Sequence, residues 1–463
     1  MEVAIAGAGI TGLAAAISLR RSGYKVNLYE RSSLNHEVGA AINVPPNVSR
    51  LLVRWGLDPV KSRFVKSRGL FFVSPITLEE QSSTIFDNHE ELYGGNIYFA
   101  HRVDLHEALK KLATMKDGPG IPATIHVKSP VVSYDLEEPS MSLADGTLIT
   151  ADLVIAADGI HSIGVNSILG RSNPPEPAQQ SNCCYRFLIS KADLEADTET
   201  RFFTQGLPSL GLTIYPDIPG QRRFITYPCR EYVHRLLCAP PPFQRIYYVN
   251  LIPTIPGPFF AYEVCNCAII CNKELDKNKT EDWQASVPKE EILEALAGYH
   301  PGIIAVAKKA TEQGRWPLLY RPPISKWHKG NMALAGDAAH PMLPNLGQGG
   351  AQGIEDGLVL GLVLHGCTAK SEISERLALY EKIRRNRAAS IQVLSNFGLD
   401  ETSTTGLEEY MEGEKIPSTM EDILQLTYGG DMVEETTKAM RELQPSWNLP
   451  NAYFGEVADP VMG

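Results

Sequence analysis

The first residues that could do chemistry are three glycines and an acid near the start of the chain. Gly7-x-Gly9-x-x-Gly12 follows the apolar run Val3–Ala6, and Glu30 closes the next apolar run. In this order of strand, glycines, helix, strand and acid, the first glycine allows a tight turn. The second lets the backbone approach a pyrophosphate, and the third lets the helix pack closely on the sheet. With the helix start facing phosphates and Glu30 facing ribose hydroxyls, the segment predicts a site for the ADP half of a dinucleotide.

Further downstream, other acids and glycines also stand where apolar runs end or a helix begins. They are Asp158-Gly159, Gly336-Asp337, Gly347 and Gly350. An aspartate at a strand end can accept hydrogen bonds from the hydroxyls of a sugar-like chain. Free N–H groups at a glycine-rich helix start would stabilise negative charge on a neighbouring ring. A nucleotide that extends from Gly7 to Asp337 is longer than NAD, and FAD fits this description.

Composition argues against several classes of function. The net charge of −11 and the pI near 5.6 disfavour nucleic acids and anionic membranes as partners. Prolines and polar residues interrupt the longest weakly polar stretch, so no membrane span is expected. Met1 lies one residue from the first predicted strand, so we expect no cleavable signal and a cytoplasmic protein. Cys265, Cys267 and Cys271 lack a CxxC pair and a neighbouring His, so no metal site is predicted.

The order of the segments predicts an α/β fold with a Rossmann-like FAD-binding domain, an inserted β-rich substrate domain and a helical C-terminal region. The predicted parts are 1–175 and 301–370 for the FAD-binding domain, 176–300 for the substrate domain and 371–463 for the C-terminal region. The alternating pattern of 64–100 makes it a candidate to add strands to the substrate domain.

Taken together, the motifs resemble those of the single-component flavoprotein aromatic hydroxylases, a class that includes salicylate and para-hydroxybenzoate hydroxylases. The resemblance is closest to the salicylate-hydroxylase-like monooxygenases of fungal secondary metabolism. It covers residues 1 to about 365 and includes the run Trp316–Gly357. The resemblance implies an FAD site that also includes Ala41 and Arg102. It links Asp158-Gly159 to both FAD and NAD(P)H, which would bind transiently because the chain has no second GxGxxG.

The same resemblance implies a mechanism in two halves. NAD(P)H reduces the flavin, and O2 then forms a C4a-hydroperoxyflavin that hydroxylates a phenolic or other electron-rich aromatic small molecule. Arg186 and Tyr227 match positions where relatives keep an arginine and a tyrosine near the substrate. Arg186 would hold a phenolate or carboxylate, and Tyr227 would hydrogen-bond a ring oxygen. For each of the two residues, the favoured alternative is a purely structural role in pairing across the sheet. Tyr215 competes with Tyr227, and His340 is interpreted as part of the fold motif.

One segment departs from the family pattern. Relatives join the strand that ends near Arg230 almost directly to the strand that begins near Glu263, whereas here residues 231–262 intervene. This segment is rich in proline and aromatic residues, and a hairpin loop usually has two to five residues. It is either a lid or homodimer contact, or a translated intron, and the rejoining flanks favour the intron. Epoxidation, decarboxylative or dearomatising hydroxylation, and a flavin-binding protein inactivated by the insertion are the alternative functions. Substrate identity, the choice of NADH or NADPH and the oligomeric state stay open.

Overall fold

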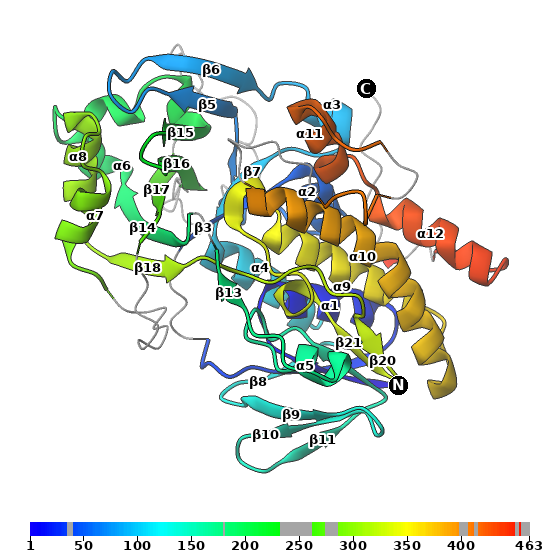
Figure 1. Ribbon diagram of the computed structural model, residues 1–463. Coiled ribbons are helices and arrows are strands. Elements are labelled where there is room, and N and C mark those ends of the chain that lie inside the picture. Colours follow the sequence, from blue (N-terminus) through cyan, green and yellow to red (C-terminus); the bar gives the residue numbers. More distant parts are fainter. Residues whose placement is uncertain are drawn as a thin grey trace, which may run out of the picture.

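The structure is a computed structural model, and its two main sheets lie side by side with helices around them (Figure 1). It describes residues 1–34, 40–178, 181–231, 262–273, 286–397, 406–411, 415–449 and 453–454. The chain is α/β: a Rossmann-like sheet with its helices, a β-rich sheet and a helical C-terminal region, as the sequence predicted.

A six-stranded sheet forms the nucleotide-binding half. Its strand order is β20-β21-β12-β1-β2-β8, and the neighbours from β21 to β8 are parallel. The strands are β1 (Glu2–Ala6), β2 (Lys25–Tyr29), β8 (Thr124–His126), β12 (Leu153–Ala156), β20 (His328–Lys329) and β21 (Met332–Leu334). The residues of β12 and β21 are all buried, as expected for parallel strands covered on both faces.

Helices α1 (Ile10–Arg21), α4 (Arg102–Thr114) and α9 (Gly349–Leu364) accompany this sheet. Helix α9 packs tightly on α1 because small residues line the contact. A Cβ added at Gly357 would lie 2.5 Å from the Ala15 nitrogen, and one at Gly361 would lie 2.0 Å from the Ser18 hydroxyl. Helix α9, which lies far downstream in the chain, therefore packs directly against the first helix of the nucleotide-binding unit.

A seven-stranded sheet forms the second half, in the order β18-β14-β17-β16-β15-β5-β6. The strands are β5 (Gly69–Val73), β6 (Glu80–Ile85), β14 (Cys183–Ser190), β15 (Leu212–Asp217), β16 (Arg222–Glu231), β17 (Tyr262–Cys271) and β18 (Gln313–Pro317). Its outer face packs against α6 (Lys191–Glu195), η1 (Arg201–Thr204), α7 (Lys289–Ala295) and α8 (Pro301–Lys308) (Figure 1). Its inner face turns toward the nucleotide-binding half, where Tyr227 contacts Phe99.

Smaller elements complete the fold. The short strands are β3 (Ala41–Val44), β4 (Val65–Lys66), β7 (Tyr98–His101), β9 (Val131–Asp135), β10 (Ser140–Leu143), β11 (Leu148–Thr150), β13 (Glu176–Pro177) and β19 (Leu319–Tyr320). The remaining helices are α2 (Pro46–Arg54), α3 (His89–Tyr93), α5 (Gly164–Leu169), η2 (Leu207–Leu210), η3 (Gly336–Ala338), η4 (Pro344–Leu346), η5 (Lys370–Glu372), α10 (Ile373–Phe397), α11 (Met420–Tyr428) and α12 (Met432–Leu443).

The packing of residues after 300 supports a later end of the substrate domain than the sequence predicts. Ile303 and Val306 of α8 belong to the apolar core of the seven-stranded sheet, and β18 is one of its strands. We therefore propose that the substrate domain extends to about residue 317 rather than ending at 300. Strands β5 and β6, from the 64–100 segment, lie in the same sheet.

Within the described residues, no helix is both long and apolar enough to cross a membrane. The same part of the chain contains no cluster of His, Cys, Asp or Glu suited to a metal ion. Its seven cysteines are all buried and form no disulfide with one another.

The hairpin of β16 and β17 stays paired up to the edge of the insertion. Arg230 pairs with Val264 and Glu231 with Tyr262, after a bulge that follows Pro228. Residues 232–261, on which the lid and intron hypotheses rest, lie outside the described residues.

Because Glu231 and Tyr262 are already neighbours, we expect a chain with Asn-Gly in place of 232–261 to fold and bind FAD. Shortening the loop this much should stabilise the protein by about 2 kcal/mol through loop-closure entropy. Soluble yield, FAD content and unfolding midpoint check this, with a Gly-Ser loop of the original length as the control. If both replacements lose FAD or solubility, the native segment contributes to the fold and the intron hypothesis is wrong.

Candidate functional site

The predicted nucleotide-binding segments converge at one edge of the six-stranded sheet. Strands β2, β1, β12 and β21 are adjacent and parallel, so their carboxyl ends lie side by side. The segments that leave these four ends carry Glu30, Gly7, Asp158 and Asp337. In open α/β sheets, ligands bind in the crevice outside the carboxyl ends of the strands.

The first glycine segment has the shape that a pyrophosphate requires. Gly7 has a φ of +95°, and a Cβ there would lie 2.4 Å from the Ala157 carbonyl oxygen. A Cβ at Gly12 would lie 2.1 Å from the Gly7 oxygen, whereas one at Gly9 would meet no atom within 4 Å. Helix α1 begins there without a side-chain cap or an acid in its first turn, so its positive end is free for an anion.

Glu30 and His106 hold this turn from two sides. The carboxylate of Glu30 accepts hydrogen bonds from the backbone nitrogens of Ala8 at 2.9 Å and Ser32 at 2.8 Å. Nε2 of His106, on α4, donates to the Ala8 carbonyl oxygen at 2.7 Å. Glu30 therefore lies at the glycine turn, where the sequence predicts its contact with ribose.

Asp337 is the exposed residue in an otherwise buried run, 332–341. Its carboxylate nevertheless lies deep among surrounding groups: burial raises its pKa, and His340, Arg102 and Arg321 act in the opposite direction. The carboxylate is thus accessible although its neighbours in the chain are buried. This geometry suits hydrogen bonds to the hydroxyls of a ribityl chain.

Gly347 and Gly350 place the start of α9 against β3. Gly347 has a φ of +62°, and a Cβ there would lie 2.6 Å from the Asn43 side-chain nitrogen. A Cβ at Gly350 would lie 2.8 Å from Cδ1 of Ile42. Helix α9 also begins without a side-chain cap or an acid in its first turn. Its dipole is thus available to stabilise negative charge on a ring bound beside β3.

Ala41, the first residue of β3, joins this region to the seven-stranded sheet. Its N–H donates to Oδ1 of Asn266 at 3.3 Å, and its carbonyl oxygen accepts from the hydroxyl of Tyr227 at 3.2 Å. Asn266 was not among the residues predicted from the sequence. The amide and the phenol come from the inner face of adjacent strands β17 and β16.

Arg186 lies on the same inner face as Tyr227. The two residues stand on β14 and β16, separated by β17, and each is half-buried. Burial raises the pKa of Tyr227, and the positive charge of Arg186 partly offsets this effect. Besides the polar Asn266 and Arg223, this face carries a cluster of small or apolar side chains: Cys184, Ile225, Ala268 and Ile270. The structure therefore brings Arg186 and Tyr227 together on the face that meets the nucleotide-binding half.

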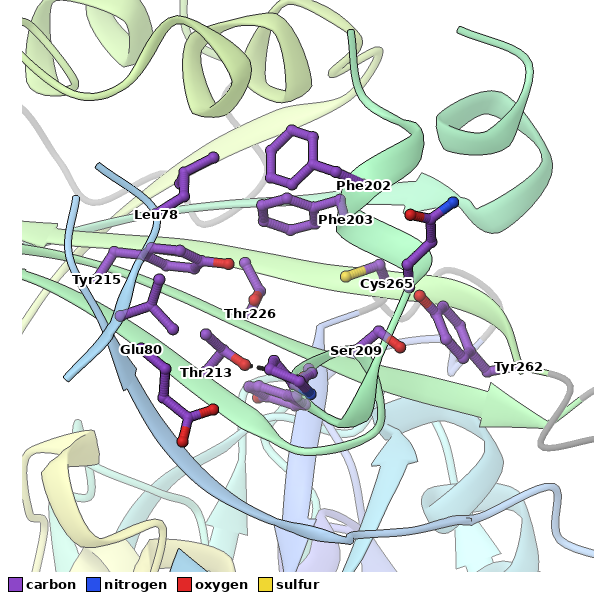
Figure 2. Close-up of a pocket in the computed structure, with 14 residues that line it drawn as sticks. Leu78, Glu80, Phe202, Phe203, Ser209, Thr213, Tyr215, Thr226, Tyr262 and Cys265 are labelled. Atoms are coloured by element: carbon purple, nitrogen blue, oxygen red, sulfur yellow. Dashed lines mark hydrogen bonds between the residues drawn. The ribbon is translucent and has the colours of Figure 1, made fainter. Parts of the chain in front are cut away.

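Tyr215, the competing candidate, lies on the opposite face of the sheet. Its ring stacks on Phe203, with centroids 5.9 Å apart, inside the outer apolar core. It lines a cavity of about 190 Å³ between the sheet and the η1–η2 segment, shown in Figure 2. The sheet layer therefore separates Tyr215 from Arg186, whereas Tyr227 also borders this cavity.

A buried ionic network, which sequence reasoning missed, holds the Gly336-Asp337 loop. Asp356 of α9 accepts from the Gly336 nitrogen at 2.7 Å, His340 at 2.6 Å and Arg384 of α10 at 2.8 Å. Arg384 also pairs with Glu355 at 2.6 Å. Burial would raise the pKa of Asp356, but His340 and Arg384 lower it to about 2. His340 is thus part of the framework, as interpreted from the sequence.

Arg321 is a second residue that no local pattern marks. It is 1% exposed, and its Nη2 donates to the carbonyl oxygens of Ile160 at 2.6 Å and Asp337 at 3.1 Å. The Nη2 atom of Arg321 thus links, by two hydrogen bonds, the loop that follows Asp158 and the loop that carries Asp337. Its Nε and Nη1 have no partner among the described residues. Burial lowers the pKa of Arg321, and the carboxylates of Asp337 and Asp158 oppose this shift.

We expect Arg321→Met to change how FAD affinity depends on pH. Asp337, whose pKa is raised by burial, would lose one of the cations that favour its ionised form. FAD affinity should then begin to fall at a higher pH than in the wild type as the solution is acidified. FAD titrations between neutral and acidic pH measure this, with Arg321→Lys keeping the charge as the control. A uniform loss of affinity at all pH values would mean that Arg321 acts on structure alone.

Comparisons with known proteins agree with this geometry. Residues 5–52 match the family described as NAD(P)-binding Rossmann-like domain, and residues 269–395 match the FAD binding domain. The chain is 42% identical over 459 residues to the FAD-dependent monooxygenase cfoG of Aspergillus candidus, covering 98% of both chains. It is 30% identical to hispidin-3-hydroxylase of Neonothopanus nambi, over 84% of this chain and 86% of that one.

Among solved structures, a salicylate hydroxylase in complex with its substrate has the same fold. The TM-score is 0.67 at 21% identity, over 95% of this chain and 98% of that chain. The site residues fit FAD: an open glycine turn for the pyrophosphate, an accessible carboxylate and a second free helix start. The chain is an FAD-dependent monooxygenase and belongs to the family of single-component FAD-dependent aromatic hydroxylases.

Proposed function

We propose that this enzyme uses NAD(P)H and O2 to hydroxylate a phenolic or other electron-rich aromatic small molecule. The observation that carries the proposal is the inner face of the seven-stranded sheet, where Arg186 and Tyr227 lie beside a small apolar cluster. Bound FAD would supply the redox chemistry, accepting a hydride from NAD(P)H and passing one oxygen atom of O2 to the substrate. A relative that carries the name hispidin-3-hydroxylase supports ring hydroxylation.

On this proposal, the chain's own groups bind the cofactor along the sheet edge. The start of α1 with Gly7, Gly9 and Gly12 holds the pyrophosphate, and Glu30 holds the ribose. Asp337 accepts hydrogen bonds from the ribityl hydroxyls.

The remaining cofactor contacts lie close to this edge. Asp158-Gly159 and the exposed Arg102 flank the cofactor, and Ala41, Gly347 and Gly350 border the ring. NAD(P)H binds only transiently.

Arg186 and Tyr227 would hold and activate the substrate. Although burial opposes its charge, the pKa of Arg186 is raised by Cys184 and Tyr227, so the guanidinium stays protonated. A fixed positive charge in a half-buried setting favours a phenolate over a phenol, and a phenolate ring is richer in electrons. The Tyr227 hydroxyl donates its proton to the Ala41 carbonyl oxygen, so its lone pairs are left to accept a hydrogen bond from a hydroxyl on the substrate ring. The apolar remainder of the face limits water near the reacting atoms.

The proposal is tested with purified, FAD-loaded protein and a panel of phenols and phenolic acids. A true substrate should stimulate NAD(P)H oxidation and yield a product with one added oxygen. Product structure distinguishes ring hydroxylation from epoxidation and from decarboxylative or dearomatising hydroxylation. A protein that binds FAD but oxidises NAD(P)H at the same rate with every compound would be the flavin-binding alternative.

Arg186→Ala should lower kcat/KM by about 30- to 1,000-fold, or about 2–4 kcal/mol, while FAD content stays unchanged. Arg186→Lys should recover part of this loss because it keeps the charge. The matched control is Arg315→Ala on the neighbouring strand β18, where the guanidinium pairs with Glu291 at 3.2 Å. Equal kinetics in wild type and Arg186→Ala would assign Arg186 to cross-strand pairing only.

A further inference from the structure

The cavity beside Tyr215 opens on the face of the sheet opposite Arg186, and it shares Tyr227 with the proposed substrate face. It lies between strands β15, β16 and β17 on one side and the η1–η2 segment on the other, with β5 and β6 at its edge (Figure 2). Thr226 and Tyr227 both line it, and the Tyr227 hydroxyl donates to the Ala41 carbonyl oxygen on the other face of the sheet. At about 190 Å³ the cavity can hold one aromatic ring, since a cavity of about 150 Å³ binds benzene.

Aromatic rings form much of the cavity wall. Phe202 and Phe203 extend from η1, and Figure 2 shows their rings above Tyr215, with Tyr262 on the far side. Phe203 lies nearly parallel to Tyr215 at 16°, and edge-on to Phe202 with centroids 5.4 Å apart. Walls that combine ring faces and edges favour an aromatic occupant.

The polar groups of the wall include two aliphatic hydroxyls whose oxygens can accept a hydrogen bond. The Thr213 hydroxyl donates to the Pro208 carbonyl oxygen at 2.9 Å, and the Ser209 hydroxyl donates to the Gly206 carbonyl oxygen at 2.7 Å. Because a hydroxyl has a single proton, both oxygens are left with lone pairs to offer. The lining residues include the carboxylate-bearing Glu80 and, among those described, no Lys, Arg or His. The Tyr215 and Tyr262 hydroxyls and the Gln205 amide also line the wall and can donate. The wall therefore suits a neutral group that both donates and accepts, such as a phenolic O–H, whereas Glu80 and the lack of a cation disfavour an anion.

From these features we propose that the cavity is a second binding site, for a neutral phenol with a single ring. The ring packs between Phe203 and Tyr262, and the phenolic O–H donates to the Thr213 or Ser209 oxygen. The site is complementary to the proposed substrate face, where Arg186 favours an anion. The inference does not depend on the reaction that the enzyme catalyses.

Two variants of one strand residue test the proposal. Thr213 lies on β15 with its side chain in the cavity, so Thr213→Phe fills the space. Thr213→Val keeps the volume and removes the acceptor. Each FAD-loaded, full-length protein is titrated with 4-fluorophenol and 4-fluorobenzoate and followed by fluorine NMR. FAD content and the unfolding midpoint of each variant are measured in parallel.

Thr213→Phe should weaken one class of 4-fluorophenol sites about tenfold or more, equivalent to about 1.4 kcal/mol. Thr213→Val should weaken it about fivefold through the lost hydrogen bond. Binding of 4-fluorobenzoate should be the same in all three proteins. A crystal of the wild-type holoprotein soaked in 4-bromophenol gives an independent readout, because the bromine should appear in the cavity.

The proposal is overturned if Thr213→Phe binds 4-fluorophenol like the wild type. It is equally overturned if the bromine occupies only the face of Arg186 and Tyr227. If Thr213→Phe does not load FAD, the bromine position in the wild-type crystal decides between the two outcomes.

Discussion

Asp337→Ala should leave the purified protein largely free of flavin. The side chain is the exposed one in a buried run and would accept hydrogen bonds from the ribityl hydroxyls. Loss of a charged acceptor costs about 1.5–3 kcal/mol, so the FAD dissociation constant should rise about 10- to 100-fold. Equilibrium titration of apoprotein with FAD, followed by flavin fluorescence, measures this directly.

Asp337→Asn and His340→Ala serve as controls for this prediction. The asparagine keeps the shape and one acceptor oxygen, so its FAD affinity should fall between those of wild type and Asp337→Ala. His340 bonds Asp356 on the buried side of the loop, so His340→Ala should bind FAD while unfolding at a lower temperature. Wild-type affinity in Asp337→Ala would remove the ribityl assignment.

Arg384→Met is expected to be the most destabilising single substitution in the α9–α10 contact. The guanidinium is 0% exposed and bonds Glu355, Asp356 and Gln352. Glu355 keeps its pair with Arg387, but Asp356 is left with His340 alone, and breaking a buried ion pair typically costs about 3–5 kcal/mol. Asp356 also accepts a hydrogen bond from the Gly336 nitrogen. We therefore expect the variant both to release FAD and to unfold at a lower midpoint. Thermal unfolding monitored by flavin fluorescence reports both effects.

The neighbouring residue provides a matched control. Arg385 is half-exposed and lies 3.8 Å from Glu381, so Arg385→Met should change the free energy of unfolding by less than about 1 kcal/mol. The network should also make the wild type sensitive to acid. Since the pKa of Asp356 falls from 3.8 to about 2 on folding, its contribution is complete above pH 3.8 and disappears as the pH approaches 2. Similar unfolding midpoints for Arg384→Met and Arg385→Met would contradict the role given to the network.

The nucleotide-binding half could be predicted from sequence because local rules govern it. A glycine that must adopt a φ of +95° and a glycine that abuts a backbone oxygen leave a signature in residue spacing. The same is true of acids at strand ends, since parallel strands bring their carboxyl ends to one edge. The fold class follows from these elements, whereas the position of α8 and β18 depends on which sheet buries their apolar side chains.

The substrate-facing residues depend on strand register, which the sequence alone does not specify. Tyr215 and Tyr227 are equivalent as sequence candidates, and only the pairing of β15 with β16 puts them on opposite faces. Asn266 lies between two buried cysteines and is polar in an apolar strand, which is a sequence signal for a buried polar contact. Arg321 and Arg384 reach their partners through tertiary contacts far along the chain, so no local pattern marks them.

The most direct test of the account supplies the enzyme with heavy-isotope O2 (¹⁸O₂), NAD(P)H and a phenolic substrate found by stimulated turnover. We predict that each product molecule carries one heavy oxygen on the ring, with one NAD(P)H consumed per product. Product oxygen derived from water, or NAD(P)H oxidation that yields only hydrogen peroxide with every phenol tested, would contradict the assignment as an aromatic hydroxylase.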